Sequence, residues 1–240
     1  GSSSAGAEAK YAAREENVLC EIESQSDLGI DVQQIDDGWQ GTNYKSWKPV
    51  KKIDNEMGEY EVYPNGWEKV KLSSEEKKIK MGLLSKVRNF VLHTGHDVRV
   101  NWDVTENEPR MGYFFAREYG NIYLENRKIS SPKNTVYSPY LVLRDAWHIS
   151  KYLNLNNFQI TVQNIDRVSK ELSDAYKHRH SYCLAITLMG IPIFFQETHY
   201  YNDAARKEIK SVLEIYKKYR SEINSNKKLN INRIEADQLV

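Results

Sequence analysis

Short apolar runs alternate along the chain with longer amphipathic stretches. The amphipathic stretches carry apolar residues at helical spacing, which predicts helices at 7–26, 67–78, 84–93, 112–119, 138–153, 173–189 and 204–223. The apolar runs predict strands at 30–35, 79–83, 98–102, 121–124, 158–163 and 191–195. The polar stretch after residue 38 predicts a long loop that ends in the turn Pro64-Asn65-Gly66.

Alternation of strands with helix-length connections predicts a parallel sheet and an α/β fold. The chain has no glycine-rich dinucleotide fingerprint and no phosphate-binding loop, which favours a (β/α) TIM-type barrel over a nucleotide-binding sheet. About six strands are recognisable where a full barrel has eight, so we expect an incomplete barrel. We divide the chain into 1–17 (an N-terminal tag and a leading helix), 18–223 (the barrel domain) and 224–240 (a polar tail).

Composition excludes some partners. The chain has 34 basic and 33 acidic residues, and this balance argues against a nucleic-acid partner. No apolar run approaches the ~18 residues that span a bilayer, so we expect no membrane partner either. Cys20 and Cys183 have neither metal nor redox spacing, and we expect both to be buried thiols. Periplasmic, extracellular and cytoplasmic locations all stay open.

Polar residues follow five of the expected strands. In a (β/α) barrel the active site forms at the carboxyl ends of the strands. A single acid after a strand is as well explained as a helix cap, but five such ends favour a site. They carry Asp36, Asp37 and Trp39; Asp103, Thr105 and Glu106; Glu125, Asn126 and Arg127; Gln163, Asn164 and Asp166; and Gln196 and Glu197.

Glycoside cleavage fits this set of residues. It requires one carboxylic acid to protonate the leaving oxygen and one carboxylate to meet the developing oxocarbenium centre. The sixteen Tyr and five Trp suit packing against sugar rings, although most of them are expected in the core and its rim. Gathered carboxylates also suit a divalent metal, so a metal-dependent barrel enzyme is an open alternative. The histidines lack ligand spacing beside these acids, and His178 and His180 are expected on a solvated helix face, so we expect no metal and no cofactor.

Several segments resemble one enzyme family. The stretch 29–40, which contains Asp36-Asp37-Gly38-Trp39, resembles the first barrel strand of melibiase-type α-galactosidases and their bacterial relatives. Tyr63-Pro64-Asn65-Gly66-Trp67 resembles a turn of that family, and 79–83 resembles its second strand. Residues 100–127 and 143–197 are similar to later parts of the barrel in a bacterial branch. The resemblance covers roughly 18–223.

The resemblance implies roles for the first strand end and for the chemistry. Asp36 and Asp37 would bind sugar hydroxyls, and Trp39 would pack on the ring. The family is retaining, with an aspartate nucleophile in a Lys-x-Asp strand and a carboxylic acid/base two strands later. None of the strands predicted above contains Lys-x-Asp, so Asp103 is our candidate nucleophile and Glu125 our candidate acid/base.

Four further residues complete the predicted site. Trp102 lies beside Asp103 and would contact the sugar, and Glu106 is the second choice for the acid/base. Arg110 and Arg144 would hold hydroxyls, with structural pairing to carboxylates as the alternative for each.

The sequence thus predicts a retaining glycoside hydrolase acting on α-galactosides or related α-glycosides, with an oligosaccharide or glycoside as its partner. The alternative is a catalytically inactive or truncated carbohydrate-binding barrel remnant. An incomplete barrel would expose sheet edges, so a homo-oligomer is a further expectation.

Overall fold

A computed structural model describes residues 14–35, 49, 51–55, 58–83, 101–102, 121–123, 138–151, 155–194 and 196–223 of the chain. Within these ranges the helices are α2 (Glu15–Leu28), α3 (Glu68–Glu76), α5 (Pro139–Ser150), α6 (His180–Ala185) and α7 (Asp203–Ile223). Short 3-10 helices are η1 (Leu155–Asn157), η2 (Ile165–Arg167), η3 (Ala175–Lys177) and η4 (Thr198–Tyr200). The strands are β1 (Val32–Ile35), β2 (Lys52–Asn55), β3 (Gly58–Glu61), β4 (Lys80–Leu83), β5 (Asn101–Trp102), β6 (Asn121–Tyr123), β7 (Phe158–Val162) and β8 (Ile191–Phe194).

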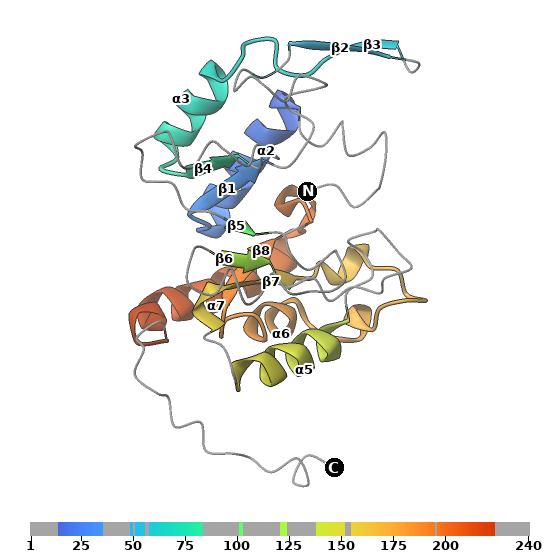
Figure 1. The fold of residues 1–240 in the computed structure, drawn as a ribbon, viewed down its shortest axis with the longest axis vertical. Helices are drawn as coiled ribbons and strands as arrows, with labels where there is room; N and C mark the ends of the chain where they lie inside the picture. The colour runs from blue at the N-terminus through green and yellow to red at the C-terminus, as the bar shows by residue number, and fades with distance from the viewer. Residues whose placement is uncertain are drawn as a thin grey trace, which may run out of the picture.

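Six of these strands pair in parallel, as the alternation of elements predicted. β1 pairs with β4, and a four-stranded sheet has the order β5-β6-β7-β8. Figure 1 shows the β1–β4 pair beside the four-stranded sheet. Parallel neighbours that follow the order of the sequence are typical of a (β/α) unit array. The described strands form no closed barrel, so the mixed α/β class is confirmed and the TIM-type barrel is not.

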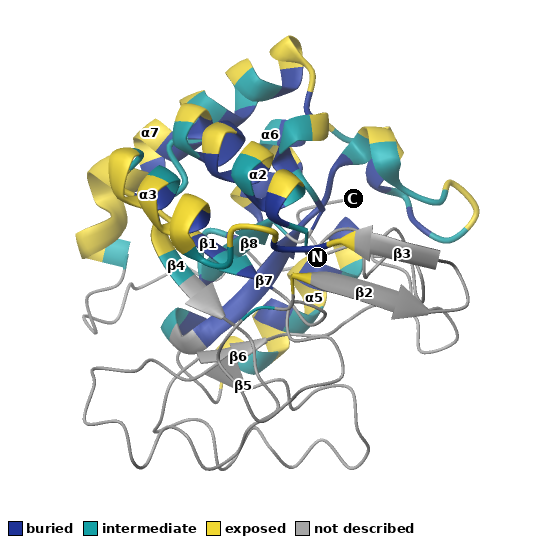
Figure 2. Ribbon diagram, turned by 90° about the horizontal axis from the view of Figure 1, so that it is seen from above, coloured by how far each residue is buried: buried dark blue, intermediate teal, exposed yellow. Residues whose placement is uncertain are grey.

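Helices cover one face of β7. Phe158 and Ile160 pack against α5 through Val142 and Ala146, and Val162 belongs to a second core cluster. That second cluster joins α2, α6 and α7 through Leu28, Leu184, Tyr201, Ala205, Ile209, Leu213 and Tyr216. Figure 2 shows β7 buried along its whole length. Its other face carries buried polar side chains instead, namely those of Gln159, Thr161 and Gln163.

α2 connects the two sheets. Val18 and Ile22 on one side of the helix pack with Ile35 of β1 in a third cluster, whereas Leu28 at its end reaches the cluster of α6 and α7. The helix ends because Gly29 adopts a left-handed conformation with φ 79°, where a side chain would be strained. α2 therefore packs against both the first strand and the last helix of the described chain.

Most predicted elements are confirmed within one to three residues where the structure describes them. Two are not. The polar stretch before Pro64 contains the antiparallel hairpin β2–β3, which we had predicted as loop. The helix predicted at 173–189 is split, because His178 and Arg179 are extended between η3 and α6. The helices predicted at 84–93 and 112–119 lie outside the described residues.

Two predictions about single residues are wrong. Cys20 is exposed on α2, whereas Cys183 is buried as expected. His180 is not on a solvated face: it is only 7% exposed, and its Nε2 lies 3.2 Å from Asp166 Oδ2. α6 therefore begins with a buried histidine that binds the loop after β7.

Candidate functional site

The carboxyl ends of β7 and β8 meet at one edge of the sheet. Val162 of β7 is in register with Phe194 of β8, so the polar residues after both strands leave the sheet side by side. Gln196 ties the two ends together. Its Oε1 accepts from the backbone N–H of Asn164 at 2.7 Å, and its Nε2 donates to the carbonyl of Arg167 at 3.1 Å. The two strand ends are thus fixed relative to each other.

Two residues after β7 have buried amide groups with missing hydrogen bonds; in Asn164 it is Nδ2 that has no partner in the described chain. Asn164 caps η2, because its Oδ1 accepts from the backbone N–H of Asp166 at 3.1 Å. Gln163 is 2% exposed, and within the described chain neither its Nε2 nor its Oε1 has a hydrogen-bond partner. An unpaired buried amide costs free energy. Gln163 therefore has unused donor and acceptor capacity at the end of the sheet where a ligand would lie.

The end of β8 is held by a carboxylate from α2. Glu21 accepts from the backbone N–H of Thr198 at 2.9 Å, from the Thr198 hydroxyl at 2.8 Å and from the backbone N–H of His199 at 3.0 Å. It also forms a hydrogen bond with His199 Nδ1. Burial alone would raise the pKa of Glu21, but these hydrogen bonds from His199 and Thr198 lower it below its usual value.

Glu21 continues into a buried polar chain that reaches β1. The amide of Gln25 donates to Glu21 Oε2 at 3.4 Å and also to the side chain of Gln33 on β1. All three side chains are buried. Because Glu21 holds η4 after β8, this chain links the first strand to the last described strand through α2.

An aromatic and cationic pair lies next to these strand ends. The Arg167 guanidinium carbon lies 3.7 Å from the ring centroid of Tyr200, a cation–π contact between η2 and η4. Tyr200 is 48% exposed, so its ring edge faces solvent at the rim of the strand ends. An exposed aromatic ring at a polar rim is a feature of sugar-binding sites.

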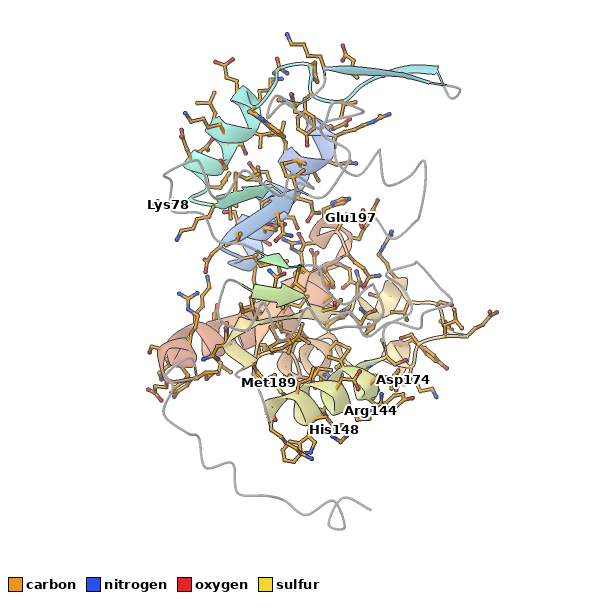
Figure 3. All side chains as sticks on the ribbon, in the orientation of Figure 1. Lys78, Arg144, His148, Asp174, Met189 and Glu197 are labelled. Atoms are coloured by element: carbon orange, nitrogen blue, oxygen red, sulfur yellow. The ribbon has the colours of Figure 1, made fainter. Side chains whose placement is uncertain are left out.

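Most of the residues predicted for the site lie outside the described residues: Asp36, Asp37, Trp39, Asp103, Glu106, Arg110 and Glu125. Trp102 ends β5, whose backbone pairs with β6. Arg144 lies on α5 and donates from Nε to Asp145 at 3.0 Å, which is the structural pairing that the sequence left open. Figure 3 labels Arg144 on α5 and Glu197 near β1, on different parts of the molecule.

Glu21 is a site residue that sequence reasoning missed. It follows Val18 by three residues and lies on the same helical face as Val18 and Ile22. A carboxylate on the buried stripe of a helix is a signal that could have identified it.

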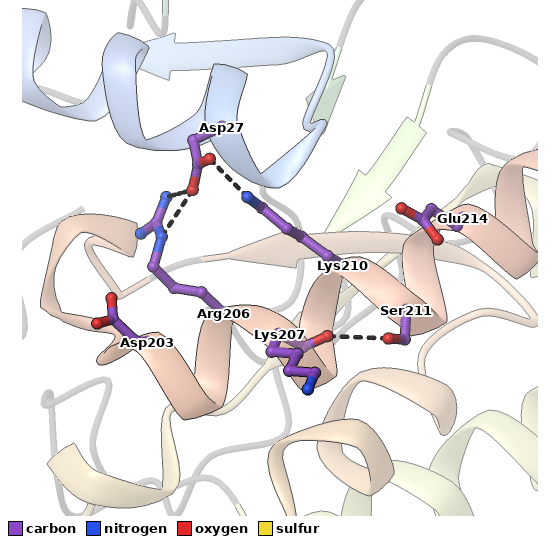
Figure 4. Close-up of a pocket in the computed structure, with 7 residues that line it drawn as sticks. All are labelled: Asp27, Asp203, Arg206, Lys207, Lys210, Ser211 and Glu214. Carbon is purple, nitrogen blue, oxygen red and sulfur yellow. Dashed lines mark hydrogen bonds and ion pairs between the residues drawn. The ribbon is translucent and has the colours of Figure 1, made fainter.

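A second region of interest is a pocket of about 480 Å³ between α2 and α7 (Figure 4). Arg206 and Lys210 both bind Asp27 there, with Arg206 Nη2 at 2.6 Å and Lys210 Nζ at 2.5 Å. The Asp27 carboxylate is satisfied by these two cations, so the contacts dock α7 on α2. The lining residues are Asp27, Asp203, Arg206, Lys207, Lys210, Ser211 and Glu214.

The described residues contain no group of three His, Cys, Asp or Glu side chains that could hold a metal ion. None of the helices in the described ranges has the length and apolar character needed to cross a bilayer.

The fold is similar to that of solved α-galactosidase structures. The galactosidase domain of the α-galactosidase-sucrose kinase AgaSK matches with a TM-score of 0.54 and 12% identity, over 88% of this chain and 39% of that chain. The GH36 α-galactosidase AgaA from Geobacillus stearothermophilus matches with the same score and identity, over 88% of this chain and 40% of that chain. A variant of AgaA in complex with raffinose matches equally well. The chain thus spans about two fifths of the length of these structures.

No family model and no curated protein matches the sequence. At 12% identity the structural likeness concerns the fold alone. It indicates a distant structural relationship to GH36 α-galactosidases.

Proposed function

We propose that the chain is a retaining glycoside hydrolase that acts on α-galactosides or related α-glycosides. The observation that carries the proposal is the likeness of its fold to GH36 α-galactosidases. Polar residues at the ends of parallel strands support it, because glycosidases of this architecture bind the sugar there. The proposal needs no cofactor, since two carboxyl groups suffice for the reaction.

Two carboxyl groups would perform the chemistry. Asp103 directly follows β5, and as nucleophile it would attack the anomeric carbon while Glu125, two residues beyond β6, protonates the leaving oxygen. Glu125 would then deprotonate the water that cleaves the glycosyl-enzyme ester. Because β5 and β6 are parallel neighbours, their carboxyl ends lie at one edge of the sheet. We expect the two carboxyl groups to stand about 5–5.5 Å apart, as a retaining mechanism requires.

The remaining predicted residues would bind the sugar. Asp36 and Asp37 follow β1 and would accept hydrogen bonds from hydroxyls, and Trp39 would cover the apolar ring face. Trp102, Glu106 and Arg110 would surround the same ring. Arg144 is already bound to Asp145 on α5, so we expect it to contribute less to substrate binding than the other predicted residues.

Hydrolysis of a chromogenic α-galactoside tests the proposal. We expect turnover by the wild-type chain, loss of about 10³-fold or more in Asp103→Asn, and a retained anomeric configuration by NMR. Glu23→Gln is the matched control, because Glu23 is an exposed carboxylate bound to Lys77 on the outside of α2. Galactose binding without turnover would support a carbohydrate-binding remnant, and loss of activity with a chelator would support the metal-dependent alternative.

A further inference from the structure

Glu197 is the N-cap residue directly before η4, but its side chain does not cap the helix. An acid at the start of a helical turn normally accepts from the free backbone N–H groups of that turn. Here the Glu197 side chain makes no such bond. Those N–H groups, on Thr198 and His199, are bound by Glu21 instead. The Glu21 carboxylate of α2 therefore caps η4 in place of Glu197.

The backbone next to Glu197 is held from several directions. Thr198 is fully buried, and its hydroxyl contacts Ser24 Oγ at 2.9 Å as well as Glu21. The guanidinium of Arg206 donates to the Thr198 carbonyl at 3.2 Å and to Ser24 Oγ at 2.9 Å. Buried hydrogen bonds on both sides of the peptide restrict its dihedral angles. The position from which the Glu197 side chain leaves the backbone is thus preorganised.

The Glu197 carboxylate itself has unused capacity. Its Oε2 is buried and has no hydrogen-bond partner in the described chain. One strand away, Gln163 is equally unsatisfied. A buried carboxylate oxygen without donors is costly unless donors arrive from elsewhere. Both side chains follow adjacent parallel strands at the carboxyl edge (Figure 3 labels Glu197).

We propose that Glu197 is a further sugar-binding carboxylate, which accepts hydrogen bonds from substrate hydroxyls, and that Glu21 is its positioning residue. The inference rests on the proposed function and adds to it a contact from β8. Hydroxyl groups supply the donors that Glu197 lacks, and the held backbone at Thr198 limits the conformational freedom that is lost on binding them. Glu21 touches no substrate and acts only through the backbone of Thr198 and His199.

Galactose titration of the full chain by calorimetry tests this proposal, together with KM and kcat on a chromogenic α-galactoside. We expect Glu197→Gln to weaken galactose binding about tenfold or more while leaving the melting temperature unchanged. Glu214→Gln is the matched control, since Glu214 is an exposed carboxylate on α7. Glu21→Gln should raise KM several-fold at temperatures where the variant is folded.

The double variant separates positioning from general destabilisation. If Glu21 acts through Glu197, then Glu21→Gln combined with Glu197→Gln binds galactose no more weakly than Glu197→Gln alone. Additive losses would overturn the positioning role. A Glu197→Gln variant that binds within twofold of an active wild type would overturn the inference while leaving the proposed function intact. A folded wild type that neither binds nor cleaves galactosides would overturn both.

Discussion

Removal of the Glu21 carboxylate, which lies on the buried face of α2, should strongly destabilise the fold. In Glu21→Ala the backbone N–H groups of Thr198 and His199 lose their acceptor, at 2.9 and 3.0 Å. The Thr198 hydroxyl keeps Ser24 as a partner, so two amide groups are left unpaired. At about 1–3 kcal/mol for each unsatisfied buried donor, we expect a loss of about 2–6 kcal/mol.

Urea unfolding followed by circular dichroism measures this loss as a lower midpoint at constant slope. In a chain of this length a loss of about 4 kcal/mol lowers the melting temperature by roughly 8–15 °C. Glu21→Gln keeps one acceptor oxygen and should lose about half as much free energy. The exposed control Glu23→Gln should stay within about 1 kcal/mol of the wild type, because its pair with Lys77 is solvated. A Glu21→Ala midpoint equal to that of the wild type would refute the reasoning.

The Glu21 carboxylate also makes the free energy of unfolding depend on pH in the acidic range. The pKa of Glu21 in the folded chain is below its ordinary value of 4.5. As pH falls, the unfolded chain therefore takes up this proton first, and the stabilisation present above about pH 4.5 is lost as pH falls through the lowered pKa. The difference in stability between wild type and Glu21→Gln should thus be constant near neutrality and narrow below pH 4.5. A difference that stays constant down to pH 3 would contradict this.

Three further measurements test the structure. Gly190→Ala should lose about 1–3 kcal/mol in urea unfolding, because a Cβ at Gly190 would lie 2.8 Å from atoms of β7; an unchanged midpoint would contradict this packing. Burial raises the pKa of Cys183 to about 12, whereas Cys20 is exposed, so a thiol reagent should modify one cysteine in the native chain and the second only on unfolding. Hydrogen bonds, foremost from Arg179, hold the pKa of Glu208 at about 2; Glu208→Gln should therefore be less stable than wild type at pH 7 and equally stable near pH 2, since this stabilisation is lost as pH falls from 4.5 towards 2.

Hydrophobic periodicity correctly predicted the helices and strands whose own residues show the apolar spacing of that element. The helix α7 shows this most clearly, because Ile209, Leu213 and Tyr216 recur at helical spacing and all three are buried. β7 was predicted from its β-branched run and is buried on both faces. Parallel pairing followed from the alternation of elements alone. The local sequence pattern was therefore sufficient to predict the α/β class. It was also sufficient to predict that the strands end at the same edge of the sheet.

The wrong helix prediction at 173–189 arises because a residue distant in sequence determines the local backbone conformation. The stretch 173–189 has helical composition, but α6 starts only at His180, because Glu208 of α7 binds the backbone N–H of Ser181 at 3.1 Å and also the Arg179 side chain. Periodicity within the stretch contains no information about Glu208. The hairpin β2–β3 was missed because each strand has four residues and a single apolar side chain, Ile53 in β2 and Tyr60 in β3.

The same kind of long-range capping connects the fold to the candidate site. Glu208 caps α6 and Glu21 caps η4, and in both cases the carboxylate comes from a helix distant in sequence. Because Glu21 caps η4, its N-cap residue Glu197 keeps a carboxylate oxygen without a partner in the described chain. His180, the first residue of α6, binds Asp166. The sequence identified Glu197 as one acid after a strand, for which capping and ligand binding were equally good explanations. The structure assigns the capping to Glu21, and this leaves Glu197 available for a ligand at the end of β8.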